Sequence, residues 1–364
     1  MTKLHDLHAA GQSVWIDFIR RDMLTTASID QTVADGVRGL TSNPSIFQQA
    51  IGTSEEYDAQ IAQIIDVVKR ADAEAVYERV AVLDIQGAAD ALRGVYEESD
   101  GADGYVSLEV SPRLAHDTGG SIADARRLWA WVNRPNLMIK IPATPAGIPA
   151  IEQLLSEGIN VNATLMFSMT DYENVAQAFI RGISAAADPR RIASVASFFV
   201  SRIDAQVDAE LEKVGSEEAM GLRGKIAIAN AKLAYQRYQE LFEGEAFADQ
   251  LTRGARPQRV LWASTSTKNP EYPDTLYVDE LVGDNTVNTV PPHTIDAFVD
   301  HGEVKPDAVI IGVGEARDQI ARLGELDIDF DAITADLQSE GVVKFADSFD
   351  DMLRTVSQKM DSLR

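Results

Sequence analysis

Residues 136–144 read Asn-Leu-Met-Ile-Lys-Ile-Pro-Ala-Thr, a short apolar run with a lysine at its centre. Apart from this lysine, residues 137–143 are apolar on both faces, which is typical of a parallel strand covered by helices. Similar runs recur along the chain and alternate with amphipathic stretches. They predict eight strands, at 13–17, 39–42, 105–110, 137–141, 159–167, 192–200, 259–264 and 286–290.

Amphipathic stretches between and after these strands predict helices. We expect them at 58–70, 73–96, 121–132, 149–157, 170–183, 202–242, 330–340 and 347–363. Eight strands that alternate with helices indicate a single (β/α)₈ TIM barrel over residues 1–364, with extra helices, especially at the C-terminus. An open, doubly wound sheet is the alternative fold. That fold usually carries a glycine-rich phosphate loop after its first strand, whereas residues 17–20 here contain no glycine.

Composition excludes several classes of function. The chain has no cysteine, so it forms no disulfide, thiolate metal site or cysteine nucleophile. Its formal charge of −24 repels nucleic acid and anionic lipid, and an anionic substrate would need a local cationic pocket. No apolar run reaches the roughly 18 residues of a membrane span. Since no secretory signal is apparent either, we expect a cytoplasmic protein without membrane or nucleic-acid partners.

One glycine-containing segment resembles the start of a dinucleotide-binding motif. Residues 309–314 read Val-Ile-Ile-Gly-Val-Gly, but Arg317 stands where the third glycine belongs. The segment also lies near the C-terminus, with no strand–helix–strand unit after it. We therefore expect a turn here, and no nucleotide cofactor.

Lys140 is the most unusual residue of the predicted strands, because strand alternation places it on the same face as Met138 and Pro142. Burying an ammonium group without a partner costs several kcal/mol. One interpretation is a strand-end lysine whose amine reaches solvent. The other is a neutral, buried amine that attacks a ketone carbonyl.

Two carboxylates also belong to predicted strands. Glu109 interrupts the third strand, with Ser107 and Ser111 on its face, and Asp17 ends the first strand. Catalytic groups of a TIM barrel lie at the C-terminal ends of its strands. Asp17 could instead cap the next helix. Two carboxylates together with a strand lysine favour acid–base chemistry around an amine.

Other polar residues could bind a substrate. Asn162 and Thr164 share one face of a strand, where they could contact a hydroxylated ligand or form a hydrogen-bonded ladder. Asn43 precedes a proline and, taken alone, indicates a turn. Arg202 and Lys268 follow strands and stand beside hydroxyl residues, which suits a phosphate, although either could form a surface salt bridge.

Taken together, these segments resemble the transaldolase family in order along the chain, from Asp17 to Pro291. The matching motifs are Thr-Ser-Asn-Pro-Ser at 41–45, Ser-Leu-Glu-Val at 107–110, Ile-Lys-Ile-Pro-Ala-Thr at 139–144, Ile-Asn-Val-Asn-Ala-Thr-Leu-Met-Phe-Ser at 159–168 and Phe-Phe-Val-Ser-Arg at 198–202. The resemblance implies that Lys140 forms a Schiff base and that Asp17 acts as acid and base on the sugar hydroxyls. It further implies that Glu109 activates a water held by Thr164. Asn43 and Asn162 match residues that bind dihydroxyacetone, and Ser197 and Arg202 match residues of the phosphate site.

The sequence departs from the family pattern at one position. Many transaldolases have a second phosphate-binding arginine after the seventh strand, where this chain has Lys268. Lysine keeps the charge but loses the bidentate fork. In this respect the chain resembles a subgroup of longer transaldolases, some of which are fused to a sugar-phosphate isomerase. We expect no isomerase domain here, because 364 residues leave no room for one.

The resemblance implies transfer of dihydroxyacetone from sedoheptulose 7-phosphate to glyceraldehyde 3-phosphate, without a metal or organic cofactor, by a monomer or homodimer. Two alternatives remain open at this stage. One is an aldolase that releases free dihydroxyacetone. The other is a non-catalytic regulatory barrel. The intact Lys140, Asp17 and Glu109 favour the transferase.

Overall fold

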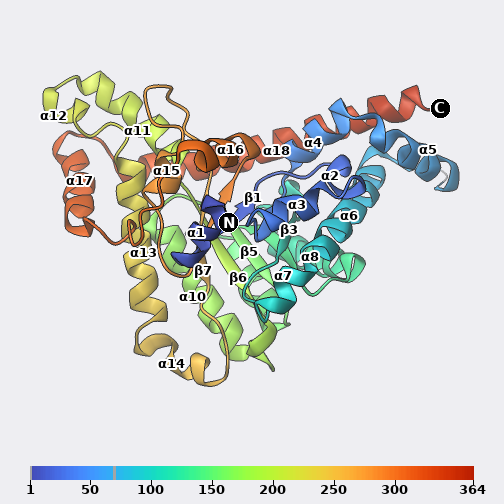
Figure 1. The fold of residues 1–364 in the computed structure, drawn as a ribbon, viewed down its shortest axis with the longest axis horizontal. Coiled ribbons are helices and arrows are strands. Elements are labelled where there is room, and N and C mark those ends of the chain that lie inside the picture. The colour runs from blue at the N-terminus through green and yellow to red at the C-terminus, as the bar shows by residue number, and fades with distance from the viewer. Residues whose placement is uncertain (1, 69–70) are drawn as a thin grey trace.

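A computed structural model describes residues 2–68 and 71–364. Within this part of the chain, parallel strands form a closed barrel in the order β1 to β8, with β8 beside β1. Figure 1 shows the strands inside a shell of helices. The strands are β1 (Gln12–Ile16), β2 (Gly39–Thr41), β3 (Val106–Glu109), β4 (Leu137–Pro142), β5 (Val161–Met166), β6 (Ser194–Phe199), β7 (Arg259–Ala263) and β8 (Thr286–Val290). The predicted (β/α)₈ barrel is confirmed, and the doubly wound sheet is excluded.

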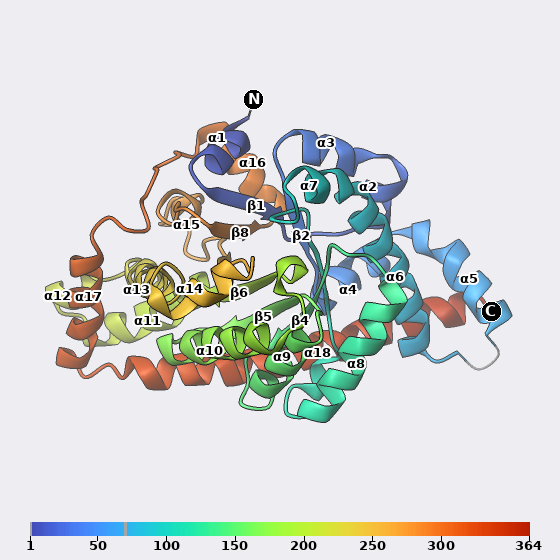
Figure 2. The same ribbon diagram turned by 90° about the horizontal axis from the view of Figure 1, so that it is seen from below.

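Helices surround the barrel as an outer layer (Figure 2). They are α1 (Lys3–Ala9), α2 (Arg21–Thr25), α3 (Ser28–Ala34), α4 (Pro44–Thr53), α5 (Asp58–Val67), α6 (Ala73–Ala91), α7 (Arg93–Glu98), α8 (Thr118–Val132), α9 (Gly147–Ser156), α10 (Met169–Ala185), α11 (Ser201–Val214), α12 (Glu217–Met220), α13 (Ile226–Phe242), α14 (Glu245–Thr252), α15 (Leu276–Asp279), α16 (Pro292–His301), α17 (Val313–Glu325) and α18 (Phe330–Ser362). Short 3₁₀ helices lie at Glu55–Tyr57, Pro112–Leu114 and Pro189–Arg191. None of the helices in the described ranges is long and apolar enough to cross a membrane.

The structure divides two of the predicted helices. The region 202–242 forms α11, α12 and α13, because Gly215 adopts a left-handed backbone (φ 67°) that ends α11. The region 73–96 divides into α6 and α7. In the predicted helix 58–70, α5 ends at Val67, and residues 69 and 70 lie outside the described part of the chain. The segment 309–312 is a turn before α17, as expected.

The two helices predicted at 330–340 and 347–363 are wrong as separate elements, because they form the single long helix α18. The intervening segment is helical and includes Gly341. A Cβ atom at this position would lie 3.1 Å from a methyl group of Leu165, so the glycine allows α18 to approach the end of β5 closely. Tertiary packing of this kind outweighs the low helix propensity of glycine.

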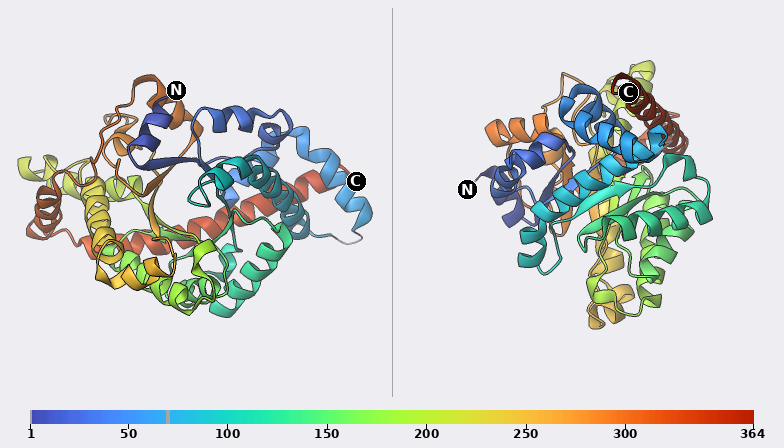
Figure 3. Two further views of the ribbon diagram at one scale, coloured as in Figure 1. Left: turned by 60° about the horizontal axis from the view of Figure 1, so that its bottom comes forward. Right: turned by 90° about the vertical axis from the view of Figure 1, so that its right-hand side faces the viewer.

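Helix α18 runs across the barrel opening, as Figure 3 shows most clearly in its left-hand view. Gln338 donates hydrogen bonds from its amide to the backbone carbonyls of Leu165 (3.1 Å) and Ala143 (3.3 Å). Near the other end of the helix, Lys359 donates to the carbonyl of Ser54 and pairs with Asp58. The helix is therefore fixed to the C-terminal ends of β4 and β5 and to the region around α5.

Candidate active site

A cavity of about 240 Å³ opens at the C-terminal ends of the strands. Seven of the nine residues predicted to form the site line it: Asp17, Asn43, Lys140, Thr164, Ser197, Arg202 and Lys268. Glu109 and Asn162 do not line the cavity itself, but each lies beside a residue that does. The barrel therefore brings the predicted residues together, although they are spread over more than 250 positions of the sequence.

Lys140 lies inside the barrel and is only 6% exposed. Its Nζ atom is 3.5 Å from the carbonyl oxygen of Ser42 and 4.0 Å from Oε2 of Glu109. The ring of Phe345, from α18, covers it with a centroid 5.8 Å away. The lysine therefore does not extend to solvent, and the interpretation of a strand-end lysine with a solvated amine is wrong.

Asp17 directly follows β1 and faces the same cavity. Its Oδ1 atom accepts a 2.6 Å hydrogen bond from the hydroxyl of Thr41, which in turn contacts Thr289 at 2.5 Å. The next helix, α2, is preceded by Arg20 at its N-cap position, so Asp17 is not a helix cap. Burial raises the pKa of Asp17, whereas Lys140 and the bond from Thr41 act in the opposite direction.

Glu109 ends β3, and its Cα is in register with that of Lys140 on β4. Burial raises the pKa of Glu109 to about 7, the negative charge of Asp17 adds to the increase, and Lys140 opposes it. Within the described residues, Oε2 of Glu109 and the hydroxyl of Thr164 are buried without a hydrogen-bond partner. Unpaired buried polar atoms are costly, so both atoms are suited to bind a substrate or a water molecule.

Asn162 and Ser197 belong to a hydrogen-bonded layer of the barrel wall. The amide nitrogen of Asn162 donates to the hydroxyl of Ser107 (3.0 Å), and its oxygen accepts from the hydroxyl of Ser197 (2.7 Å). Asn162 thus forms the polar ladder that the sequence left as one of two possibilities. Asn43 caps α4 by accepting a bond from the amide of Ile46 (3.0 Å), and it also lines the cavity.

Two cations lie at the rim of the cavity. Arg202 stands in the first turn of α11, 5.5 Å from the ring centroid of Phe199, and Lys268 follows β7. Neither residue forms an ion pair with any other described residue, so the surface salt bridges considered from the sequence are absent there. Burial lowers the pKa of both side chains, and the positive charge of Arg202 lowers the pKa of Lys268 further. Two cations without carboxylate partners, beside the N-terminus of a helix, are suited to an anion.

Sequence reasoning missed several residues of this cavity, among them Thr41, Thr289, Phe345 and Ser264, and also the strained position Leu165 next to Thr164. Leu165 (φ 63°) and Ser264 (φ 56°) have left-handed backbones at or directly after the ends of β5 and β7. Such strain is concentrated at functional sites. Thr41 could have been found, because it lies two residues before Asn43 in a motif already recognised.

The fold and site together define an α/β-barrel enzyme with a buried lysine between two carboxylates and a cationic rim. The model of the transaldolase/fructose-6-phosphate aldolase family matches residues 14–356. The chain is 47% identical to a transaldolase of Frankia alni, with 98% of this chain and 97% of that protein covered. It is 48% identical to a transaldolase of Thiobacillus denitrificans (96% and 98% covered) and 44% identical to transaldolase 1 of Streptomyces coelicolor (99% and 95%). The chain belongs to the transaldolase/fructose-6-phosphate aldolase family.

Proposed function

We propose that this enzyme is a transaldolase that acts on sugar phosphates. It transfers a dihydroxyacetone unit from sedoheptulose 7-phosphate to glyceraldehyde 3-phosphate and so forms erythrose 4-phosphate and fructose 6-phosphate. This reaction belongs to the non-oxidative branch of the pentose phosphate pathway. The observation that carries the proposal is the placement of Lys140, whose buried Nζ lies 4.0 Å from Glu109 in a cavity that also contains Asp17.

Lys140 supplies the nucleophile. Its neutral amine attacks the ketone carbon of the donor, and loss of water gives an iminium ion. The positive iminium nitrogen then accepts the electrons that carbon–carbon cleavage releases. The chemistry therefore needs no metal or organic cofactor as an electron sink.

Glu109 and Thr164 handle the protons of the dehydration step. A carboxyl group with a pKa of about 7 is populated in both protonation states near neutral pH, so it can donate and accept a proton in turn. The unpaired hydroxyl of Thr164 can hold the water that relays this proton. Because Glu109 is in register with Lys140, the relay ends at the nitrogen where the Schiff base forms.

Asp17 acts on the substrate hydroxyl. It takes the proton from the C4 hydroxyl, the C3–C4 bond breaks, and the electron pair moves into the iminium to give an enamine. The aldose phosphate leaves, and the three-carbon unit stays on Lys140 until the acceptor aldehyde adds in the reverse direction. The raised pKa of Asp17 increases its strength as a base at this step.

Arg202 and Lys268 bind the substrate phosphate, together with Ser197. Asn43 holds the hydroxyls of the dihydroxyacetone unit, and Asn162 contributes through the second proton of its amide, because the first donates to Ser107. The support for this assignment is that both cations lack carboxylate partners among the described residues and line the same cavity as Lys140. A phosphate at this rim would also lie near the N-terminus of α11, where free backbone N–H groups favour an anion.

Borohydride trapping tests the proposal. Incubation with fructose 6-phosphate and borohydride, followed by peptide mass mapping, should place a three-carbon adduct on Lys140. An adduct on another lysine, or none, would contradict the mechanism. An activity assay with sedoheptulose 7-phosphate as the donor, with and without glyceraldehyde 3-phosphate, separates the alternatives. Formation of fructose 6-phosphate supports a transaldolase, free dihydroxyacetone would identify an aldolase, and neither product a non-catalytic barrel.

We also propose that the whole chain acts as one barrel domain in the cytoplasm, as a monomer or a homodimer. Light scattering at several protein concentrations distinguishes the two oligomeric states. A larger assembly would contradict this part of the proposal.

A further inference from the structure

A second and larger cavity, of about 500 Å³, lies at the opposite, N-terminal end of the barrel. Its size falls within the range of small-molecule sites. The side chains of Trp15, Tyr105 and Met138 belong to its lining and are at most 2% exposed. Trp15 precedes Asp17 by two residues, and Met138 precedes Lys140 by two, so a layer of apolar side chains separates this cavity from the candidate active site.

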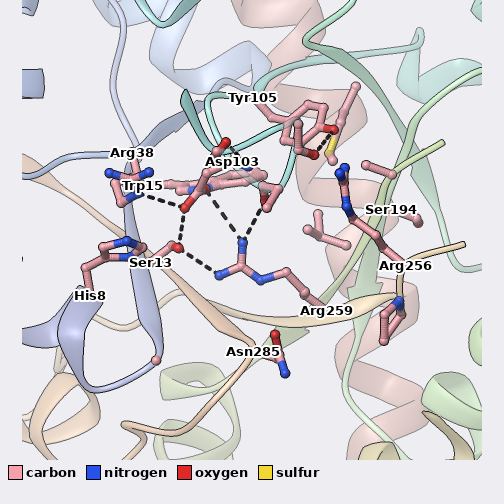
Figure 4. A pocket seen from close by; sticks show the side chains of 18 of the residues that line it. His8, Ser13, Trp15, Arg38, Asp103, Tyr105, Ser194, Arg256, Arg259 and Asn285 are labelled. Atoms are coloured by element: carbon pink, nitrogen blue, oxygen red, sulfur yellow. Dashed lines mark hydrogen bonds and ion pairs between the residues drawn. The ribbon is translucent and has the colours of Figure 1, made fainter. Parts of the chain in front are cut away.

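Three arginines approach this cavity from different sides (Figure 4). Arg259 reaches across the end of the barrel from β7, with Arg38 on one side of it and Arg256 on the other. Three guanidinium groups around one cavity are unexpected in a protein with a formal charge of −24. Their number and their convergence indicate a local requirement for positive charge.

Asp103 holds two of these arginines and is itself buried. It pairs with Nε of Arg38 (3.0 Å) and with Arg259 (3.6 Å), and it also accepts bonds from Ser13 and from the indole of Trp15 (2.8 Å). Two cations therefore share one carboxylate, and the cluster keeps one positive charge in excess. A partly buried excess charge is costly unless a counter-ion reaches it.

Donor atoms of Arg38 remain available for such a counter-ion, whereas both terminal nitrogens of Arg259 already donate, to Ser13 (2.7 Å) and to the carbonyls of Thr286 (2.7 Å) and Ala102 (3.2 Å). Arg38 makes hydrogen bonds only through Nε among the described residues, so both of its terminal nitrogens are free, and its side chain is 22% exposed. Nε of Arg259 is buried, and within the described ranges it has no partner. Arg256 pairs with Asp100, a carboxylate that is fully exposed and therefore strongly solvated.

The carboxylates at the rim do not neutralise the cluster. Glu98 and Asp284 line the opening, but both are exposed, so solvent screens them. His8 also lies at the opening, and burial together with the charge of Arg38 lowers its pKa, so it adds no positive charge near neutral pH. The excess charge thus stays at Arg38 and Arg259.

We propose that the N-terminal cavity is a second ligand site, which binds a small phosphate monoester distinct from the substrate in the active site. Arg38 and Arg256 keep free guanidinium nitrogens that can donate to the phosphate oxygens, and Arg259 adds positive charge, which suits a doubly charged phosphate better than a singly charged carboxylate. The apolar layer of Trp15, Tyr105 and Met138 receives the carbon part of the ligand. This proposal is independent of the chemistry at Lys140.

Calorimetric titration with inorganic phosphate tests the proposal in an Arg202→Ala background, which weakens the phosphate site at the other end of the barrel. Adding Arg38→Met should weaken the remaining phosphate binding at least ~10-fold, since a charge-assisted bidentate contact is lost. Arg181→Met is the matched control. Arg181 is half exposed on α10, pairs with Glu152 at 2.8 Å, and should leave binding unchanged.

A second variant keeps the test decisive if Arg38→Met does not fold. Arg256→Met leaves the buried Asp103 network intact and should also weaken phosphate binding. Three results would overturn the proposal: no phosphate binding in the Arg202→Ala protein, equal affinities in the arginine variants and the Arg181 control, or acetate binding as tightly as phosphate at equal ionic strength.

Fluorescence gives an independent reading, because Trp15 shares Asp103 with the arginines. Phosphate should change the emission of the Arg202→Ala protein but not that of the variant that also carries Trp15→Phe; an equal change in both would count against the site.

Discussion

The two ends of the barrel use charge in opposite ways. At the C-terminal end, Arg202 and Lys268 have no carboxylate partner among the described residues, and Glu109 keeps a buried oxygen without a hydrogen bond. At the N-terminal end, Asp103 accepts three hydrogen bonds and also pairs with Arg259, and only a part of each arginine remains free. The comparison teaches that a reactive centre keeps individual polar atoms and cations without a hydrogen-bond partner, whereas a binding cluster can be built on a paired core. The expected effects of substitutions at the two ends differ accordingly.

The largest effect is expected for Lys140→Arg. A guanidinium does not act as a neutral amine, so turnover should fall by more than ~10⁴-fold. The circular dichroism spectrum should stay unchanged, because the long side chain remains within the same apolar wall. Measurable Schiff-base chemistry in this variant would show that another residue carries the intermediate.

Asp17→Asn comes next, because it removes the base but keeps the size of the side chain. General base catalysis is worth about 100- to 10,000-fold in rate, and turnover should fall within that range. The Schiff base forms before the C3–C4 bond breaks. Borohydride should therefore trap the intact sugar on Lys140 rather than the three-carbon fragment, and the adduct mass distinguishes the two. Near-normal turnover would show that another group, first of all Glu109, is the base.

Arg202→Ala should act on binding rather than on chemistry. Loss of a charge-assisted contact costs roughly 1.5–3 kcal/mol, so KM for fructose 6-phosphate should rise by about 10- to 150-fold. The reaction with unphosphorylated acceptors should scarcely change. Steady-state kinetics that measure KM separately for fructose 6-phosphate as donor and for an unphosphorylated acceptor check the difference, and an equal loss on both would mean that Arg202 is structural.

Glu109→Gln should reveal the cost of the buried carboxylate. The pKa of Glu109 is raised from 4.5 to about 7, so the folded state favours the protonated acid. The contribution of the Glu109 carboxyl to the free energy of unfolding is fully present below pH 4.5 and is lost as the pH rises through 7. Above pH 7 the glutamine variant should be the more stable protein, by up to about 3 kcal/mol. Urea unfolding at pH 5 and pH 8 checks the sign, and an equal difference at both values would contradict it.

The smallest effect on catalysis is expected at the other end of the barrel. Arg38→Met, tested without added phosphate, should leave kcat/KM within about twofold, because the apolar layer separates Arg38 from the active site. This variant sharpens the comparison, since it changes a cationic cavity of the same barrel without touching the substrate. A loss of tenfold or more would show that the two ends are coupled.

The sequence alone predicted the barrel and most of the residues around the candidate active site, for a physical reason. In a parallel barrel, strand alternation decides which side chains point inward, and the C-terminal strand ends meet at one mouth. Strand alternation and the common mouth therefore group Asp17, Lys140 and Thr164 from the sequence alone. The same logic left two interpretations of Asn162 open, because strand alternation does not show whether its amide bonds a ligand or the neighbouring strands.

Other features depend on contacts between residues far apart in the sequence. No local pattern shows that α18 continues through Gly341 or that Phe345 covers Lys140, because both follow from packing of the last helix against the barrel. The left-handed backbone of Leu165 could not be predicted, because the sequence indicates this conformation mainly where a glycine stands. The cluster of Arg38, Asp103 and Arg259 escaped notice for a similar reason, since a surface arginine and a ligand-binding arginine look alike in one sequence.

The path of α18 also has a consequence for the synthesis of the enzyme. Phe345 and Gln338, which contact the catalytic mouth, are translated after every strand of the barrel. A nascent chain on the ribosome can thus close its barrel while Lys140 still lacks its aromatic cover. The ring of Phe345 and the hydrogen bonds of Gln338 are added only when α18 emerges, so the active site is completed later in synthesis than the barrel that carries it.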